Sequence, residues 1–317
     1  MKVGLVVPSY PNERRVALLP EDIDAFPDDL VVERGFGASM GIHDSEYASK
    51  GCEILSREEM FKSCDTIFAL KLLQPQDYPL IREGQMIIGW THPTGSGVNF
   101  MEQQALPKHL KIVDLDNAYP KFYCDGKSVA LDFLPKNFLS KNSFYAGFSS
   151  TMHAFLSYGA YPDSTMNIAV LGNGNTAQGV FHFLSKFTDN IRMFYRKTIP
   201  EFKDQIGTFD VIVNGIEVDR PGYHLISKKE IAQTKPGCFF IDAAADAGNT
   251  IEGTKYTSID QPMYEEDGRI FYEVNNSPSI IYRTASRFLS KAFAETVFKP
   301  GVSRFWEFCV AGDAQGL

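Results

Sequence analysis

The stretch NIAVLGNGNTAQGVFHFLSKFTDNIRMFYRK, residues 167–197, decides the fold. A short apolar strand at Ile168–Leu171 leads into a Gly-x-Gly-x-x-Ala motif at Gly172–Ala177. An apolar-periodic segment follows, and then a second strand at Ile191–Tyr195. The two glycines allow a tight turn and a close backbone approach to a pyrophosphate, and the alanine lets a helix pack closely on the strand. The order is typical of the first βαβ unit of a dinucleotide-binding domain.

The end of the second strand indicates which dinucleotide binds. An NAD enzyme usually has Asp or Glu there to hold the ribose 2′-hydroxyl, but this chain has Arg196 and Lys197, whose cations suit a 2′-phosphate. We therefore predict NADP(H). Two alternatives remain open at this point: a glycine-rich turn that binds nothing, and a basic pair that is simply solvated. The predicted cofactor-binding residues are Gly172, Asn173, Gly174, Asn175, Thr176, Ala177, Tyr195, Arg196 and Lys197.

Composition narrows the class of protein. The chain has 317 residues, of which 44% are hydrophobic and 22% charged, which is an ordinary globular profile with room for about two domains. Its net charge of −8 argues against nucleic acid or an anionic membrane surface as a partner. The 5 cysteines are widely spaced, with no C-x-x-C pair, so we expect no disulfide framework, no metal site and a cytoplasmic location. No apolar run is long enough to span a membrane.

Strands and helices also alternate in the residues before the cofactor motif. The expected fold class is α/β, with two Rossmann-like domains, each a mostly parallel sheet flanked by helices, and a cleft between them. A predicted helix at Thr284–Phe298 is expected to return to the first domain. The expected boundaries are therefore 1–140 and 285–317 for a substrate domain, and 141–284 for an NADP-binding domain.

Four polar residues end or follow predicted apolar segments: Arg15, Lys71, His92 and Asp246. If both sheets present their carboxyl ends to one cleft, these side chains converge there. Each also has a plainer interpretation. Arg15 can form a surface ion pair with Glu13, and Lys71 can be a solvated strand end. His92 can belong to a capped turn, and Asp246 can cap a loop.

Five segments resemble, in order, motifs of the alanine dehydrogenase, transhydrogenase and saccharopine dehydrogenase family. They cover nearly the whole chain and read NERRVALLPEDI, CDTIFALKLLQPQDYPLIREGQMIIGWTH, AVLGNGNTAQG, GCFFIDAAADAGN and VNNSPSIIYRTAS. Within the family the chain looks closest to an opine-type, NADP-dependent branch. It is shorter than alanine dehydrogenases, lacks their glycine-rich insertion, and has Arg196 and Lys197 where they carry an acid.

The resemblance implies an NADP-dependent oxidoreductase acting on CH–NH bonds, assembled as a homo-oligomer. It implies the NADPH-dependent reductive condensation of pyruvate with the side-chain amine of ornithine or lysine to give an N-(1-carboxyethyl) amino acid. Three alternatives stay open: reductive amination of pyruvate as in alanine dehydrogenase, a saccharopine-type reaction, and an NADP-binding regulatory protein without catalysis.

The chemistry implied by the resemblance suggests a role for each candidate. Arg15 binds the pyruvate carboxylate through its fork of donors, and Lys71 both binds the substrate and polarises the ketone oxygen. His92 acts as general acid and base while the carbinolamine and imine form. Asp246 balances the cationic imine as hydride arrives, and Asn276 is its polar neighbour on the substrate side.

Overall fold

The computed structural model describes residues 1–115, 120–218, 220 and 222–314. The chain divides into two compact units. Unit 1 comprises Met1–Leu139 and Tyr282–Leu317, and unit 2 comprises Ser140–Ile281. The domain boundaries predicted from the sequence, after residues 140 and 284, lie close to these divisions after Leu139 and Ile281. The polypeptide leaves unit 1 after Leu139 and returns to it at Tyr282, so unit 1 is discontinuous in sequence.

Unit 1 is built on an eight-stranded sheet with the order β3-β2-β1-β4-β5-β6-β7-β8. The six strands from β3 to β6 are parallel, and β7 and β8 are antiparallel additions at one edge. β4 and β5 are almost entirely buried, as expected for central strands covered on both faces. The strands are β1 (Lys2–Leu5), β2 (Asp29–Glu33), β3 (Glu53–Leu55), β4 (Thr66–Lys71), β5 (Met86–Trp90), β6 (Lys111–Asp114), β7 (Lys121–Cys124) and β8 (Lys127–Ala130).

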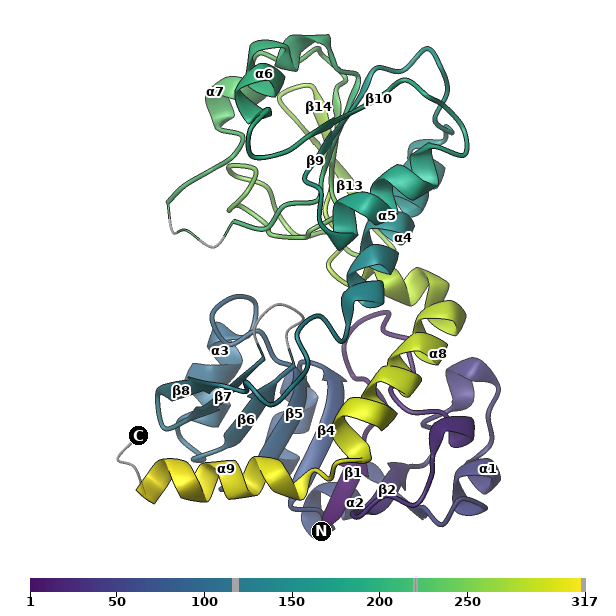
Figure 1. Cartoon of the computed structure of the whole chain (residues 1–317), viewed down its shortest axis with the longest axis vertical. Helices are drawn as coiled ribbons and strands as arrows, with labels where there is room; N and C mark the ends of the chain where they lie inside the picture. The colour runs from purple at the N-terminus through teal and green to yellow at the C-terminus, as the bar shows by residue number, and fades with distance from the viewer. Residues whose placement is uncertain (116–119, 219, 221, 315–317) are drawn as a thin grey trace. The chain divides into compact units, whose positions relative to one another are not determined.

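Helices from both ends of the chain cover this sheet. The described helices of unit 1 are α1 (Asp44–Ala48), α2 (Arg57–Ser63), α3 (Val98–Phe100, continued by a π turn at Met101–Ala105), α8 (Tyr282–Phe293, continued by a π turn at Ala294–Phe298) and α9 (Ser303–Ala314). α8 and its π turn bury Leu289, Phe293 and Val297 in the same core as β1, β4 and β5. Figure 1 shows α8 and α9, in yellow, against the strands of the N-terminal half.

Unit 2 has a six-stranded sheet with the order β10-β9-β11-β12-β14-β13, parallel except for β13. Its strands are β9 (Ile168–Leu171), β10 (Ile191–Phe194), β11 (Val211–Asn214), β12 (Phe239–Asp242), β13 (Met263–Glu266) and β14 (Arg269–Tyr272). Its described helices are α4 (Ser140–Tyr158), α5 (Asn175–Leu184), α6 (Ile199–Asp204) and α7 (Lys228–Ile231). The predicted pair of mostly parallel sheets flanked by helices is confirmed. No helix in the described part of the chain is both long and apolar enough to cross a bilayer.

Two Asp-Gly hairpins form the antiparallel edges of the sheets. Asp125 and Gly126 join β7 to β8, and Asp267 and Gly268 join β13 to β14. All four residues have positive φ, between 46° and 78°. Two consecutive positive φ values are the signature of the type I′ turn, which suits the twist of a two-residue hairpin.

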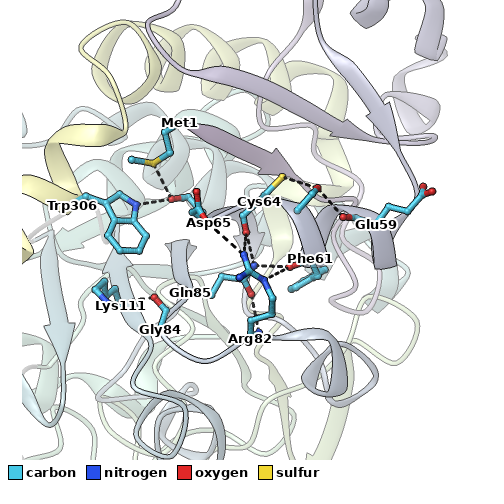
Figure 2. Close-up of polar contacts among 12 residues, drawn as sticks. Met1, Glu59, Phe61, Cys64, Asp65, Arg82, Gly84, Gln85, Lys111 and Trp306 are labelled. Carbon is cyan, nitrogen blue, oxygen red and sulfur yellow. Dashed lines mark hydrogen bonds and ion pairs between the residues drawn. The ribbon is translucent and has the colours of Figure 1, made fainter.

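Side-chain hydrogen bonds join helices to the amino-terminal ends of the unit 1 strands. Figure 2 shows Arg82 and Gln85 donating to the backbone carbonyls of Phe61 and Cys64. Nearby, the indole nitrogen of Trp306 on α9 donates to the hydroxyl of Thr66, at the start of β4, at 2.9 Å. These bonds fasten α2 and α9 to the sheet. The candidate catalytic side chains lie at the opposite, carboxyl edge.

Candidate active site

Lys71 occupies the last position of β4, beside an irregularity in the sheet. The register between β4 and β5 shifts after Ala69 and Gly89, so that Lys71 pairs with Trp90 and Leu70 is the extra residue. A Cβ on Gly89 would lie 1.7 Å from the carbonyl oxygen of Ala69, so only glycine fits there. Bulges of this kind re-aim side chains beside functional sites. The Lys71 ammonium lies 5.5 Å from the centre of the Tyr10 ring.

Arg15 lies in the loop after β1 and is 1% exposed. Its Nε and one terminal nitrogen donate to the two carboxylate oxygens of Glu13, at 2.7 and 2.6 Å. The Arg15 guanidinium also lies 5.0 Å from the centre of the Trp90 ring. The ion pair with Glu13 therefore exists, but the interpretation of it as a surface pair is wrong, because both side chains are buried. Glu13 fixes the orientation of the guanidinium, and breaking a buried pair is costly.

His92 stands two residues beyond β5 in a left-handed conformation, with φ of 44°. The carboxylate of Asp114, at the end of β6, holds this turn. One oxygen of Asp114 accepts from the backbone N–H of Thr91 at 2.8 Å, from the Thr91 hydroxyl at 3.1 Å and from the backbone N–H of His92 at 3.2 Å. A non-glycine residue with positive φ is strained, and such strain persists where the surroundings enforce it.

Gly97 offers a test of how tightly this turn is packed. A Cβ at Gly97 would lie 1.9 Å from the carbonyl oxygen of Thr91 and 2.8 Å from that of His92. We expect Gly97→Ala to displace both carbonyls, lower the free energy of unfolding by about 1–3 kcal/mol and lower turnover. Chemical denaturation and steady-state kinetics measure the two effects. Gly95→Ala is the matched control, because its Cβ would meet the same His92 carbonyl at 3.9 Å, an ordinary contact. Equal behaviour of the two variants would contradict the packing argument.

Trp90 and Asp114 are site residues that the sequence analysis missed. Trp90 pairs with Lys71 across the two strands, and its ring lies beside the Arg15 guanidinium; His92 follows it by two positions in the chain. Its indole nitrogen donates to the carbonyl of Leu115 at 3.1 Å. A signal for Asp114 was present, because it ends an apolar strand in the way that Lys71 does.

In unit 2 the glycine motif forms the turn between β9 and α5. Gly172 has φ of 104°, a conformation that favours glycine. Its N–H donates to the carbonyl of Phe194, at the end of β10, at 2.7 Å. Gly174 is the N-cap of α5 and provides no side-chain cap for the first N–H groups of the helix. A Cβ on Gly174 would meet nothing within 4 Å. Ala177 is fully buried, and a Cβ on Gly215, after β11, would lie 2.9 Å from the Ala177 Cβ.

This geometry fits a dinucleotide. The first N–H groups of α5 have no side-chain cap, and the space beside Gly174 is open. An anion at this helix N-terminus would be stabilised by the N–H groups and by the helix dipole. Tyr195, Arg196 and Lys197 follow β10 beside this turn and are exposed. No ion pair joins Arg196 or Lys197 to another described residue, and no acidic side chain stands at the end of β10. Two exposed cations therefore follow β10.

Asp246 lies in the loop after β12 and is held by three donors. The backbone N–H of Val218 and the hydroxyl of Thr250 donate to one carboxylate oxygen, at 3.2 and 2.9 Å. The side-chain amide of Asn249 donates to the other, at 2.7 Å. Asp246 therefore does cap its loop, as one of the two interpretations predicted. This structural role is compatible with a second role in binding a ligand. Asn276 follows β14 and is 3% exposed, and its carbonyl accepts from the N–H of Ser279 at 2.9 Å.

The structure thus assembles the predicted residues in two groups. Arg15 follows β1, Lys71 ends β4 and His92 follows β5, all at the carboxyl edge of the unit 1 sheet. The glycine motif, the basic pair, Asp246 and Asn276 all follow strands at the carboxyl edge of the unit 2 sheet, which is where α/β sheets bind ligands. Within residues 1–115, 120–218, 220 and 222–314, no group of three or more His, Cys, Asp or Glu side chains could hold a metal ion.

Two family models match the chain. The N-terminal domain of the alanine dehydrogenase/PNT family matches residues 7–117, and the C-terminal domain of the same family matches residues 165–308. A solved structure of an L-alanine dehydrogenase has a TM-score of 0.71 to this chain at 19% identity, covering 94% of this chain and 89% of that one. At that identity the likeness concerns the fold alone.

Curated relatives are much closer in sequence. The N(5)-(carboxyethyl)ornithine synthase of Clostridium botulinum is 51% identical over 298 residues, which cover 94% of each chain. The N(5)-(carboxyethyl)ornithine synthase of Lactococcus lactis subsp. lactis is 52% identical over 305 residues, covering 96% of this chain and 98% of the relative. The predicted resemblance is confirmed: the chain belongs to the alanine dehydrogenase/PNT family, whose members use a nicotinamide cofactor, and it is an oxidoreductase acting on CH–NH bonds.

Proposed function

We propose that this protein catalyses the NADPH-dependent reductive condensation of pyruvate with the side-chain amine of ornithine or lysine, giving an N-(1-carboxyethyl) amino acid. The observation that carries the proposal is the position of Arg15, Lys71 and His92 after β1, at the end of β4 and after β5, at one edge of one sheet, in a chain half identical to enzymes named carboxyethylornithine synthases. The names of those relatives supply the carboxyethyl group and the ornithine. The side chains of this protein supply the means of binding and activating an oxo acid.

Each residue of unit 1 has a role that its surroundings support. Arg15, held rigidly by Glu13, offers its guanidinium to the pyruvate carboxylate. Lys71, re-aimed by the bulge in β4, donates to the ketone oxygen and stabilises the negative charge that develops as the amine attacks. His92 removes a proton from the attacking amine and delivers one to the departing hydroxyl, as an imidazole can near neutral pH.

The residues of unit 2 bind the cofactor and balance charge. The N-terminus of α5 and the glycine motif hold the pyrophosphate, and Arg196 and Lys197 hold the 2′-phosphate. The nicotinamide, when bound, supplies the hydride. Asp246 stabilises the cationic imine, and Asn276 adds a polar contact to the substrate. We further propose a cytoplasmic homo-oligomer. The buried free thiols of Cys52, Cys64 and Cys238 support a reducing compartment.

The test is a screen of NADPH oxidation in which pyruvate is offered with each amino acid of a panel. NADPH should be consumed only when pyruvate and ornithine or lysine are both present. Equal turnover with pyruvate and ammonia would instead support an alanine-dehydrogenase-like reaction. Turnover with 2-oxoglutarate and lysine would support a saccharopine-type reaction. A protein that binds NADPH but turns over none of these pairs would be a regulatory protein.

Cofactor preference can be tested separately. We expect Arg196→Asp to weaken NADPH binding by about 1–3 kcal/mol more than NADH binding, because it removes a charge-assisted contact that NADPH alone makes. Direct titration of both nucleotides measures this difference. Lys186→Asp makes the same charge change at an exposed position just beyond the C-terminal end of α5 and should leave the preference intact. An unaltered preference in Arg196→Asp would remove the reason for choosing NADP.

A further inference from the structure

Two buried carboxyl groups lie side by side at the carboxyl edge of the unit 2 sheet. β12 and β14 are parallel neighbours, and Ile241 pairs with Tyr272. The next residues, Asp242 and Glu273, are therefore adjacent across the two strands, where neighbouring strands are about 4.8 Å apart. Ile241 and Tyr272 pack into one core, so alternation places Asp242 and Glu273 together on the opposite face. Each is 1% exposed.

The hydrogen bonds of this pair are strongly unequal. One oxygen of Asp242 accepts three: from the side-chain amide of Asn214 at 2.9 Å, and from the backbone N–H groups of Ala244 and Ala245 at 3.1 and 3.0 Å. The other oxygen of Asp242 and both oxygens of Glu273 receive no hydrogen bond from the described residues. Three buried acceptors in one place are costly unless a donor reaches them.

Among the described residues, the groups that shift the pKa of Glu273 include no cation that could neutralise a second charge. The ionisable groups that interact with Glu273 are Asp242 and Asp246, with the phenols of Tyr256 and Tyr264 beside them. The nearby hydroxyl of Thr254 donates to the carbonyl of Ile251, at 3.0 Å. A proton on the pair itself would give one Glu273 oxygen a hydrogen to donate and would supply the unpaired Asp242 oxygen with its donor.

We propose that Glu273 is a positioning residue that stays protonated and donates its proton to the unpaired oxygen of Asp242. The proton belongs on Glu273 because three donors already favour the charged form of Asp242, whereas only the nearby Thr254 hydroxyl, which donates to Ile251, lowers the pKa of Glu273. Burial is the main cause that raises the pKa of Glu273, to about 9, and the charge of Asp242 raises it further. Burial also raises the pKa of Asp242, although the bond from Asn214 opposes this.

The pair controls the turn that carries Asp246. Asp242 holds the N–H groups of Ala244 and Ala245, and Ala245 is kept in a left-handed conformation with φ of 55°. Asp246 is the next residue. The proton on Glu273 prevents repulsion from breaking this arrangement, so it orients the carboxylate that we assign to the cationic imine. This consequence rests on the proposed function of Asp246, whereas the shared proton does not.

Glu273→Gln tests the proton without any assay of activity. The amide of Gln can donate to the same Asp242 oxygen but cannot ionise. Because the folded protein raises the pKa of Glu273 above its ordinary value, the stability that the neutral acid contributes is complete below about pH 4.5 and is lost as pH rises to about 9. The melting temperature of Glu273→Gln minus that of wild type should therefore increase steadily between those limits and then level off. A constant difference would overturn the proposal. Glu265→Gln, an exposed position on β13, is the matched control and should show no such trend.

Activity tests the positioning role. Glu273→Leu leaves the Asp242 oxygen without a donor, so kcat should fall at least tenfold while the KM for pyruvate stays near that of wild type. Glu273→Gln should restore kcat to within a few-fold of wild type, and it should lack the loss of turnover that we expect of wild type above about pH 9. Equal kcat values for the Leu and Gln variants would refute the positioning role. If the pH trend in stability appears but wild type does not turn over pyruvate with any amine, the proposed function fails and the shared proton stands.

Discussion

Replacing His92 with alanine should lower kcat for pyruvate-dependent NADPH oxidation by about two to four orders of magnitude, because the variant has no group to move protons as the carbinolamine forms and loses water. The KM values should change little. The left-handed turn that carries His92 is held through the backbone by Asp114, so removing the imidazole leaves the turn in place. Steady-state kinetics over a range of pH measures the effect.

The control for His92 is another histidine of unit 1. His109 is exposed and contacts the carboxylate of Asp125 at 2.7 Å, in a turn between α3 and β6. His109→Ala should retain wild-type turnover. A large rise in KM for His92→Ala, with kcat preserved, would show that the imidazole binds substrate without transferring protons.

Replacing Lys71 with methionine should lower kcat by about two to three orders of magnitude, because the variant loses the donor that stabilises charge on the ketone oxygen. The KM for pyruvate should rise as well, since we propose that the same ammonium binds the oxo acid. Methionine keeps the length of the side chain and suits the half-buried position at the end of β4. Lys62→Met, at an exposed position on α2, removes a cation from the same unit and should be silent. A wild-type kcat in Lys71→Met would contradict the proposal that Lys71 activates the ketone.

The sequence predicted the strand that leads into the glycine motif well. The strand at Ile168–Leu171 occurs where expected, because buried parallel strands are short apolar runs with polar ends. The antiparallel edges β7, β8 and β13 were missed, because such half-exposed strands lack continuous apolar runs. Their Asp-Gly turns were a usable signal, since that dipeptide favours the type I′ hairpin.

The candidate site was predictable by residue type but not by environment. A polar residue that ends or follows an apolar strand can be recognised from the sequence alone, and this pattern identified Lys71, His92 and Asp246. Burial of the Arg15–Glu13 pair depends on Trp90, which is 75 positions further along than Arg15, so no local pattern reveals it. The adjacency of Asp242 and Glu273 likewise depends on the register of two strands. The prediction that both sheet edges face one cleft stays a prediction.

The return of the chain to unit 1 has a consequence for synthesis on the ribosome. Phe293 and Val297 belong to the core that also contains Val3, Leu5 and Phe68. Translation reaches them only after all of Ser140–Ile281 has been made. Unit 2 can therefore fold first. The N-terminal part of unit 1 keeps its apolar strands exposed until α8 and α9 have been made. A nascent polypeptide stalled at Leu317, with the segment from Tyr282 still inside the ribosomal tunnel, should resist protease in unit 2 and be cleaved in unit 1.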